Sequence, residues 1–159
     1  MPRSLLLNHA LLFLCCSIYL GTGVTLVFFQ LPLEPLLTPD NYAMIFVKPV
    51  ENATSFFTYM TIVMLITGAV MLFSEWFSGI RWVPVVVVLG VIAATAVEVI
   101  VIFPLNRELT EGIADPARVR IVFHEWAALN RIRAAIWALQ WAAMMYWFGR
   151  LAYEARSDR

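Results

Sequence analysis

Charged side chains are scarce in this sequence. Asp, Glu, Lys and Arg make up 14% of its 159 residues, whereas about 25% is typical of soluble domains. Hydrophobic residues account for 62%. This composition excludes an ordinary soluble domain and predicts an integral membrane protein whose first partner is the lipid bilayer. The length allows about four spans of roughly 20 residues each.

No long basic segment is present, and the 11 Lys and Arg residues balance the 11 Asp and Glu residues. Proteins that bind nucleic acid normally carry a basic surface, so nucleic acid is excluded as a partner. Cysteine is also rare. Cys15 and Cys16 are adjacent in an apolar run, where neighbouring helical positions point about 100° apart and form no ordinary disulfide. We expect both to be buried as small apolar side chains.

Motifs for cofactors, metals and nucleophilic catalysis are missing as well. The sequence has no Gly-rich phosphate loop and no Gly-x-Ser-x-Gly elbow, so it implies no cofactor, and the identity of any cofactor stays unknown. Its two histidines are His9 and His124. His124-Glu125 resembles the start of a zinc motif, but position 128 is Ala where that motif needs a second histidine. No metal site is predicted.

Four apolar runs are long enough to form membrane helices. They predict spans at about 5–30, 55–76, 82–103 and 119–151, within one domain that covers 1–159. The runs are continuous and lack the alternation of barrel strands. The predicted fold class is therefore all-α, an integral membrane four-helix bundle with up-down-up-down topology.

Two segments between the runs carry turn and capping signals. Prolines at 32, 35, 39 and 49 disfavour a long helix and predict a long Pro-rich loop between the first two spans, which could act as a lid. Before the fourth span, Asp115 can cap a helix and Pro116 suits its first turn. A helix from there to about residue 155 would be roughly 60 Å long, so its first turns should project from the membrane or pack on the loop.

The distribution of positive charge predicts an orientation. Four spans place both termini on one membrane face, together with the arginines at 3, 81, 150, 156 and 159. The other face carries Lys48, Arg107, Arg118 and Arg120. Because the face with more Lys and Arg is usually cytoplasmic, we expect cytoplasmic termini, and the plasma (inner) membrane as the location in a bacterium.

One carboxylate, Glu98, lies inside the apolar run from Trp82 to Phe103. A charge at the centre of a membrane helix costs about 2.5–3.5 kcal/mol on insertion scales, so it normally has a partner or a function. Antiparallel packing would bring it to the same mouth of the bundle as Gln30, Asn106, Asn130 and Arg133.

The fourth span carries an aromatic stripe that includes polar residues. At 100° per residue, about one third of its circumference holds Trp126, Asn130, Arg133, Trp137, Gln140, Trp141 and Met144. This face should point into the bundle. Three interpretations of the charges stay open: Glu98 and Arg133 form a structural ion pair, Arg131 and Arg133 extend to the membrane surface, or the polar residues line a cavity that binds a ligand or moves a proton.

Pro104-Leu105-Asn106, followed about twenty residues later by Trp126, Asn130 and Arg133 at the spacing Trp-x-x-x-Asn-x-x-Arg, resembles a signature of the anthrone oxygenase-like family. These are small four-helix membrane proteins, many of which are catalogued in bacteria only as a domain of unknown function. Fungal members are associated with oxidation of an anthrone to an anthraquinone. The resemblance implies an oxidoreductase in which Glu98 is the base and Arg133, Asn130 and Asn106 stabilise an oxyanion.

Together these observations predict an intramembrane pocket for a small lipophilic ligand, aromatic or quinone-like. The predicted catalytic residues are Glu98 and Arg133, and the predicted substrate-binding residues are Gln30, Asn106, Trp126, Asn130, Trp137, Gln140 and Trp141. The alternative is a non-catalytic membrane subunit or assembly partner, in a homo-oligomer or a larger complex, whose polar residues only fix the bundle.

Overall fold

The structure is a computed structural model that describes residues 2–157, apart from the side chains of residues 51 and 52. Within that range the chain is helical with short connections, and no strand occurs. The all-α prediction is confirmed.

The first half of the chain forms two long helical segments. α1 (Arg3–Thr25) continues through the π-helical η1 (Leu26–Gln30) into the 3₁₀-helical η2 (Leu31–Leu36). A connection at 37–42 leads to the π-helical η3 (Ala43–Val47), which continues as α2 (Lys48–Ser74). The predicted long Pro-rich loop is therefore mostly helical, and only residues 37–41 lie outside a helix. Pro32 and Pro49 are each the second residue of an element, η2 and α2, and each element directly follows a π-helical turn.

The second half forms two more long segments. α3 (Trp82–Val97) continues through the π-helical η4 (Glu98–Ile102) into α4 (Phe103–Glu111). α5 (Pro116–Ser157) is a single helix of 42 residues. The Asp115 carboxylate accepts a hydrogen bond from the Ala117 amide at 2.9 Å, which confirms the predicted cap.

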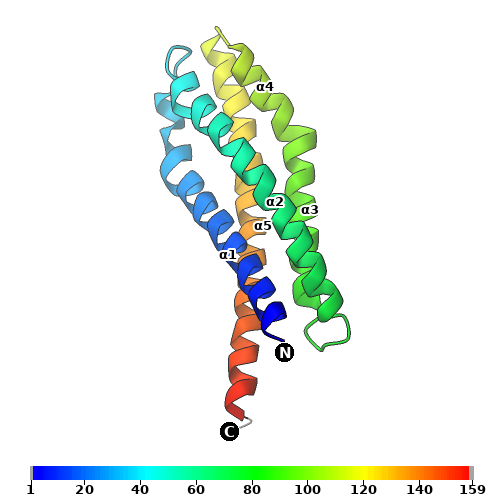
Figure 1. Cartoon of the computed structure of the whole chain (residues 1–159). Helices are drawn as coiled ribbons and strands as arrows, with labels where there is room; N and C mark the ends of the chain where they lie inside the picture. Colours follow the sequence, from blue (N-terminus) through cyan, green and yellow to red (C-terminus); the bar gives the residue numbers. More distant parts are fainter. Residues whose placement is uncertain (1, 158–159) are drawn as a thin grey trace.

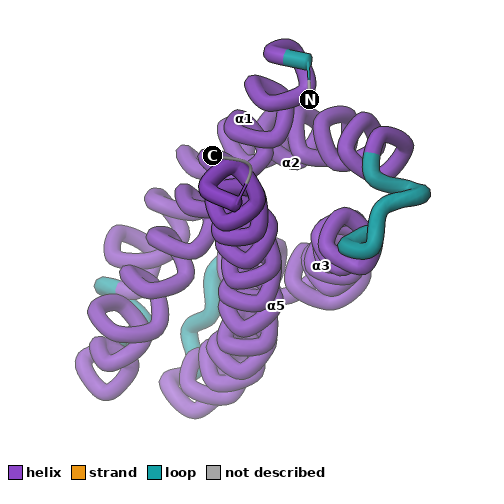
Figure 2. Tube along the Cα trace, turned by 90° about the horizontal axis from the view of Figure 1, so that it is seen from below, coloured by secondary structure: helices purple, strands orange, loops and turns teal. Residues whose placement is uncertain are grey.

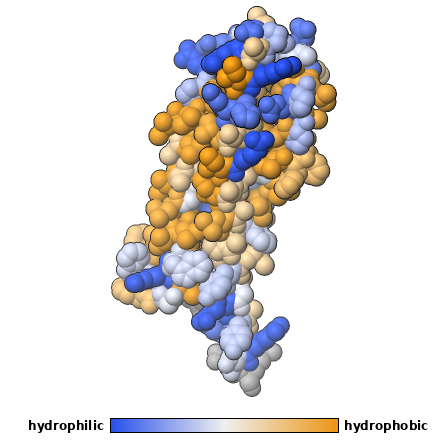
Figure 3. All heavy atoms as spheres, turned by 180° about the vertical axis from the view of Figure 1, so that it is seen from behind, coloured by the Kyte–Doolittle hydropathy of each residue, from blue (hydrophilic) through white to orange (hydrophobic). Residues whose placement is uncertain are grey.

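Three of these segments are long and apolar enough to cross a membrane: Arg3–Leu36, Ala43–Ser74 and Trp82–Glu111. Figure 3 shows an apolar belt between two polar ends on the face that it presents. These features indicate a membrane protein. α5 is not one of the three, because Arg131, Arg133 and Gln140 interrupt its apolar stretch. A fourth span at 119–151 stays a prediction.

Each of the three π-helical segments ends two residues before a proline. The Leu31, Lys48 and Phe103 amides donate to the carbonyls of the residues five positions before them, Leu26, Ala43 and Glu98. Pro32, Pro49 and Pro104 follow directly after those three donors. Proline lacks an amide proton, and its ring clashes with the carbonyl four residues earlier. A widened turn just before the proline relieves that clash, so each of these prolines marks a local bend.

Each of the four long helices packs against two of the others, so that together they form a closed ring. α5 packs against α1 and α3, and α2 packs against the same two helices. Figure 1 shows both termini at one end, here named the termini end, and α4 with the 37–42 connection at the other, the loop end. The last turns of α5 extend past the other helices at the termini end (Figure 1). Figure 2 shows α5 beside α1 and α3 from below.

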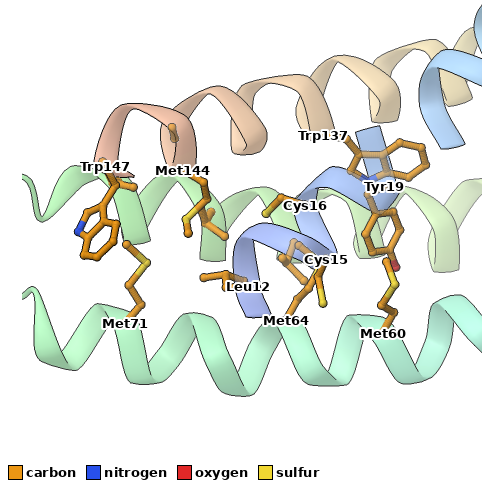
Figure 4. Packing of buried hydrophobic residues seen from close by; sticks show 14 residues of the cluster. Leu12, Cys15, Cys16, Tyr19, Met60, Met64, Met71, Trp137, Met144 and Trp147 are labelled. Carbon is orange, nitrogen blue, oxygen red and sulfur yellow. The ribbon is translucent and has the colours of Figure 1, made fainter. Parts of the chain in front are cut away.

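Buried apolar side chains form two separate clusters. The cluster toward the termini end contains many sulfur atoms, and Figure 4 labels Leu12, Cys15, Cys16, Tyr19, Met60, Met64, Met71, Trp137, Met144 and Trp147 among its members. Cys15 and Cys16 are unpaired and buried, as expected. The cluster at the loop end includes Leu31, Tyr42, Phe46, Phe123 and Trp126.

Polar contacts hold the loop end together. Arg118 at the start of α5 donates two hydrogen bonds, of 2.6 and 2.8 Å, to the Glu108 carboxylate of α4. The Tyr42 hydroxyl donates to the Leu109 carbonyl at 3.1 Å and accepts from the Ile113 amide at 2.8 Å. The first turns of α5 thus pack on neighbouring segments, which is one of the two outcomes predicted for them.

Candidate ligand-binding cavity

A cavity of about 870 Å³ lies between the two apolar clusters. Residues of both clusters form its walls, with Tyr19, Met64 and Trp137 from one side and Leu26, Phe46 and Trp126 from the other. Its lining comes from all four long helical segments. It is named the central cavity below.

The polar centre of the wall is an ion pair between the Arg133 guanidinium and the Glu98 carboxylate. The two side chains are 15% and 22% exposed, so they are largely shielded yet accessible from the cavity that they line. The guanidinium also lies 4.9 Å from the ring centroid of Trp137, a cation–π contact. Of the three interpretations left open, the ion pair is present, and the interpretation in which Arg133 extends to the membrane surface is wrong. Arg131 is exposed.

A chain of hydrogen bonds continues from this pair to α4. The Asn130 side-chain carbonyl accepts from Arg133 at 3.1 Å, and its amide donates to the Trp126 backbone carbonyl at 2.9 Å. The Trp126 indole in turn donates to the Asn106 side-chain carbonyl at 2.8 Å. Asn130 therefore positions Arg133, while Asn106 keeps its amide protons for another acceptor.

The deep side of the cavity is closed by Gln140 and the aromatic side chains near it. Gln140 is 1% exposed, and its amide donates to the Val87 carbonyl on α3 at 2.8 Å. A Cβ on Gly90 would lie 2.8 Å from the Gln140 side chain, so glycine permits this close helix approach. The Tyr19 ring lies 5.1 Å from the Trp137 ring, and its hydroxyl is 2.7 Å from the Thr61 hydroxyl.

Threonines make a second part of the wall, which the sequence interpretation missed. They come from three helices: Thr22, Thr25, Thr54, Thr58, Thr61 and Thr95. Thr54 and Thr58 donate to carbonyls of their own helix at 2.8 Å, which satisfies the proton and leaves the oxygen as an acceptor. The signal was present in the sequence, since positions 54, 58 and 61 share one helix face.

All three π-helical segments contribute to the same cavity. Leu26 and Gln30 come from η1, Ile45 and Phe46 from η3, and Glu98 with Val99 and Ile102 from η4. Such turns are frequent at functional sites because they re-aim side chains. Glu98 itself is the residue whose carbonyl accepts the π-type hydrogen bond.

The structure brings together most of the predicted site residues. Asn106, Trp126, Asn130, Trp137 and Gln140 line the central cavity with the ion pair. Gln30 also lines it and is exposed at its edge. Trp141 is not among the lining residues; it is half-buried and lies 6.2 Å from the Phe13 ring.

The two histidines lie far from this polar centre. His9 is fully buried at the termini end, 4.7 Å from the Trp147 ring, with Nε2 3.7 Å from a Glu75 oxygen. His124 is exposed at the loop end, 3.6 Å from a Glu34 oxygen. Among the described residues, no three His, Cys, Asp or Glu side chains gather closely enough to hold a metal ion.

Comparison with known proteins gave no match to a family model, to a curated protein or to a solved structure. The resemblance to the anthrone oxygenase-like family therefore stays a prediction from the signature residues.

Proposed function

We propose that this chain is a four-helix, up-down-up-down membrane bundle whose central cavity binds a small lipophilic molecule, aromatic or quinone-like. The observation that carries the proposal is the central cavity itself, which combines apolar side chains and threonines with one shielded ion pair. In this proposal α5 is the fourth span, the termini are cytoplasmic and, in a bacterium, the membrane is the plasma (inner) membrane.

The size and lining of the cavity support this ligand class. Small-molecule sites typically measure about 300–1,000 Å³ and are mostly apolar with a few placed polar groups. The central cavity, at about 870 Å³, falls in that range. Tyr19, Phe57 and Trp137 lie on its wall, and their flat faces suit stacking against an aromatic ring.

The polar groups suit a ligand that carries a carbonyl oxygen. Arg133 and the Asn106 amide can donate to such an oxygen, and the Glu98 carboxylate can accept a proton from a neighbouring C–H or O–H group. With an anthrone this gives an oxidation that balances. Glu98 removes a proton from the methylene carbon, the carbanion adds to O₂, and the resulting peroxide anion takes that proton back from Glu98. The hydroperoxide then loses water, through loss of the remaining C–H proton and cleavage of the O–O bond, to leave the second carbonyl of the anthraquinone.

A rival function is supported by the same ion pair. Glu98 and Arg133 neutralise each other, and Asn130 holds the guanidinium in place, so the network could serve only to fix helix register. The end of α5 that extends past the other helices (Figure 1) would then offer a surface to another membrane subunit or a second copy of the chain.

Filling the cavity tests the binding proposal. Thr58 lines the cavity, whereas its neighbour Tyr59 is 71% exposed and does not line it. Thr58→Trp should weaken binding of 2-methyl-1,4-naphthoquinone at least about tenfold, since overpacking costs about 1–3 kcal/mol. Tyr59→Trp adds a tryptophan of the same size outside the cavity and should leave affinity within about twofold. Calorimetry on the purified proteins in detergent measures both, and equal affinities would contradict the proposal.

Turnover separates the oxidoreductase from the subunit. Oxygen consumption with an anthrone should occur in the wild-type protein and be lost in Glu98→Gln, because the amide keeps the shape but cannot take the proton. Circular dichroism checks that the variant is folded. Retained turnover in a folded Glu98→Gln protein would refute Glu98 as the base, and binding without turnover in the wild type would favour the subunit.

A further inference from the structure

A second, smaller cavity of about 350 Å³ lies beside the central cavity, next to α4 at the loop end. It is named the outer pocket. Val47 of η3, Leu109 of α4 and Phe123 of α5 line it and do not line the central cavity.

The two cavities are adjacent and share part of their walls. Six residues line both: Phe46, Val50, Thr54, Phe103, Asn106 and Trp126. A molecule in the central cavity therefore reaches the outer pocket by passing these side chains, with no helix in between.

The shared wall is held firmly on the α5 side. Trp126 is 5% exposed and donates to Asn106 at 2.8 Å. Its ring lies 5.5 Å from the Phe123 ring and 5.8 Å from the Phe46 ring. With its edge bonded and both neighbours aromatic, Trp126 has a fixed position in the wall that the two cavities share.

The outer pocket is apolar in its body; its polar lining residues are Thr54 and Asn106 on the shared wall and two residues at its rim. Phe46, Val47, Phe103 and Phe123 form the body. The rim is formed by Arg107, which pairs with Glu111 at 2.7 Å, and by Thr110, whose hydroxyl donates to the Asn106 carbonyl at 2.8 Å. Both rim residues already have partners within α4. The body thus suits a hydrocarbon group better than a second charged or polar molecule.

We infer that the ligand of the central cavity is an aromatic or quinone-like ring that bears a hydrocarbon side chain, with the ring beside Arg133 and the chain in the outer pocket. This inference rests on the proposed function, since it names the part of the same ligand that extends past Trp126. Residues lining only the outer pocket then select for the chain, whereas Glu98 and Arg133 act on the ring.

Two probes and two variants test the inference. 2-Methyl-1,4-naphthoquinone has no chain, and its 3-prenyl derivative has one. Thr110 lines only the outer pocket and is exposed at the rim, so Thr110→Trp should fill the pocket without disturbing the core. Ala114 is exposed in the connection to α5 and lines neither cavity, which makes Ala114→Trp the matched control. Val47→Trp fills the pocket from η3 and serves as the second filling variant if Thr110→Trp proves unfolded by circular dichroism.

The expected result is selective. The wild type and Ala114→Trp bind both probes, and the filled pocket lowers affinity for the prenyl probe at least about tenfold while affinity for the short probe stays within about twofold. If the filling variant weakens both probes equally, or neither, the chain does not lie in the outer pocket and the inference is overturned while the proposed function stands. If the wild type binds neither probe, the inference and the proposed function both fail.

Discussion

The same four helices are packed closely toward the termini end and stand apart around the central cavity. Toward the termini end, Leu12, Met71, Val83, Val87 and Met144 are fully buried in one apolar cluster. Past Tyr19 and Trp137 the walls carry threonines and the ion pair, and about 870 Å³ stays open. The difference shows that the cavity is a property of particular positions along each helix, not of the helices as a whole.

Two kinds of residue account for the contrast. Gly90 allows α3 and α5 to approach closely, since a Cβ there would meet Gln140 at 2.8 Å. The π-helical turns that precede Pro32, Pro49 and Pro104 contribute residues to the wall of the central cavity. Flexible methionines fill the remaining gaps in the packed region, as Figure 4 shows for Met60, Met64, Met71 and Met144. Different residues of the same helices thus determine the close packing at one end and the central cavity at the other.

The largest expected effect comes from removing one charge at the cavity. Arg133→Leu leaves the Glu98 carboxylate without its partner, which should lower the free energy of unfolding by about 3–5 kcal/mol. The double variant with Glu98→Gln should recover much of that loss, because no uncompensated charge remains. Unfolding in detergent across the four members of this double-mutant cycle measures the coupling; strictly additive losses would mean that the pair is not energetically linked.

A smaller effect is expected in the packed region. Gly90→Val adds a side chain where Gln140 lies, so it should cost about 1–3 kcal/mol through overpacking and disturb the hydrogen bond to Val87. Gly149→Val is the matched control, since a Cβ at Gly149 meets nothing within 4 Å. Thermal unfolding of both variants checks the difference. Equal stabilities would show that the close approach at Gly90 does not limit the packing.

Removing the π-helical turn before Pro104 should lower ligand affinity without lowering the stability of the fold. Pro104→Ala restores an amide that can make the ordinary helical hydrogen bond, and alanine is favoured over proline in a helix interior by about 3 kcal/mol. Loss of the π turn rotates Asn106 relative to Glu98, so naphthoquinone affinity should fall about tenfold while thermal stability does not fall. Pro84→Ala, in the first turn of α3 and away from any π turn, should leave affinity unchanged. An unaltered affinity in Pro104→Ala would show that the π-helical turn before Pro104 does not shape the binding site.

The sequence supports much of this architecture because its signals are local. Continuous apolar runs predict helices, Asp115 predicts a cap, and a lone Glu98 facing Arg133 predicts a pair because an unpaired charge is costly in a membrane. The helix and cap signals depend on one residue and its near neighbours, whereas the pairing of Glu98 with Arg133 also needs antiparallel packing of the third and fourth spans.

Other features depend on how the helices meet. Trp141 shares a helix face with Trp137, yet it packs on Phe13, because α1 covers that face toward the termini end. The threonine wall depends on the position of α2 relative to the ion pair, and this position depends on how the helices pack. The prolines at 32, 49 and 104 could have been interpreted as bends within helices, but proline by itself does not distinguish a bend from a loop.

Photoaffinity labelling in membranes tests the central claim most directly. An azidonaphthoquinone should label peptides that carry cavity residues such as Thr58, Glu98 and Trp137, and excess 2-methyl-1,4-naphthoquinone should compete that labelling away. Labelling confined to exposed apolar positions outside the cavity, such as Ile66 and Phe73, without competition, would contradict the account.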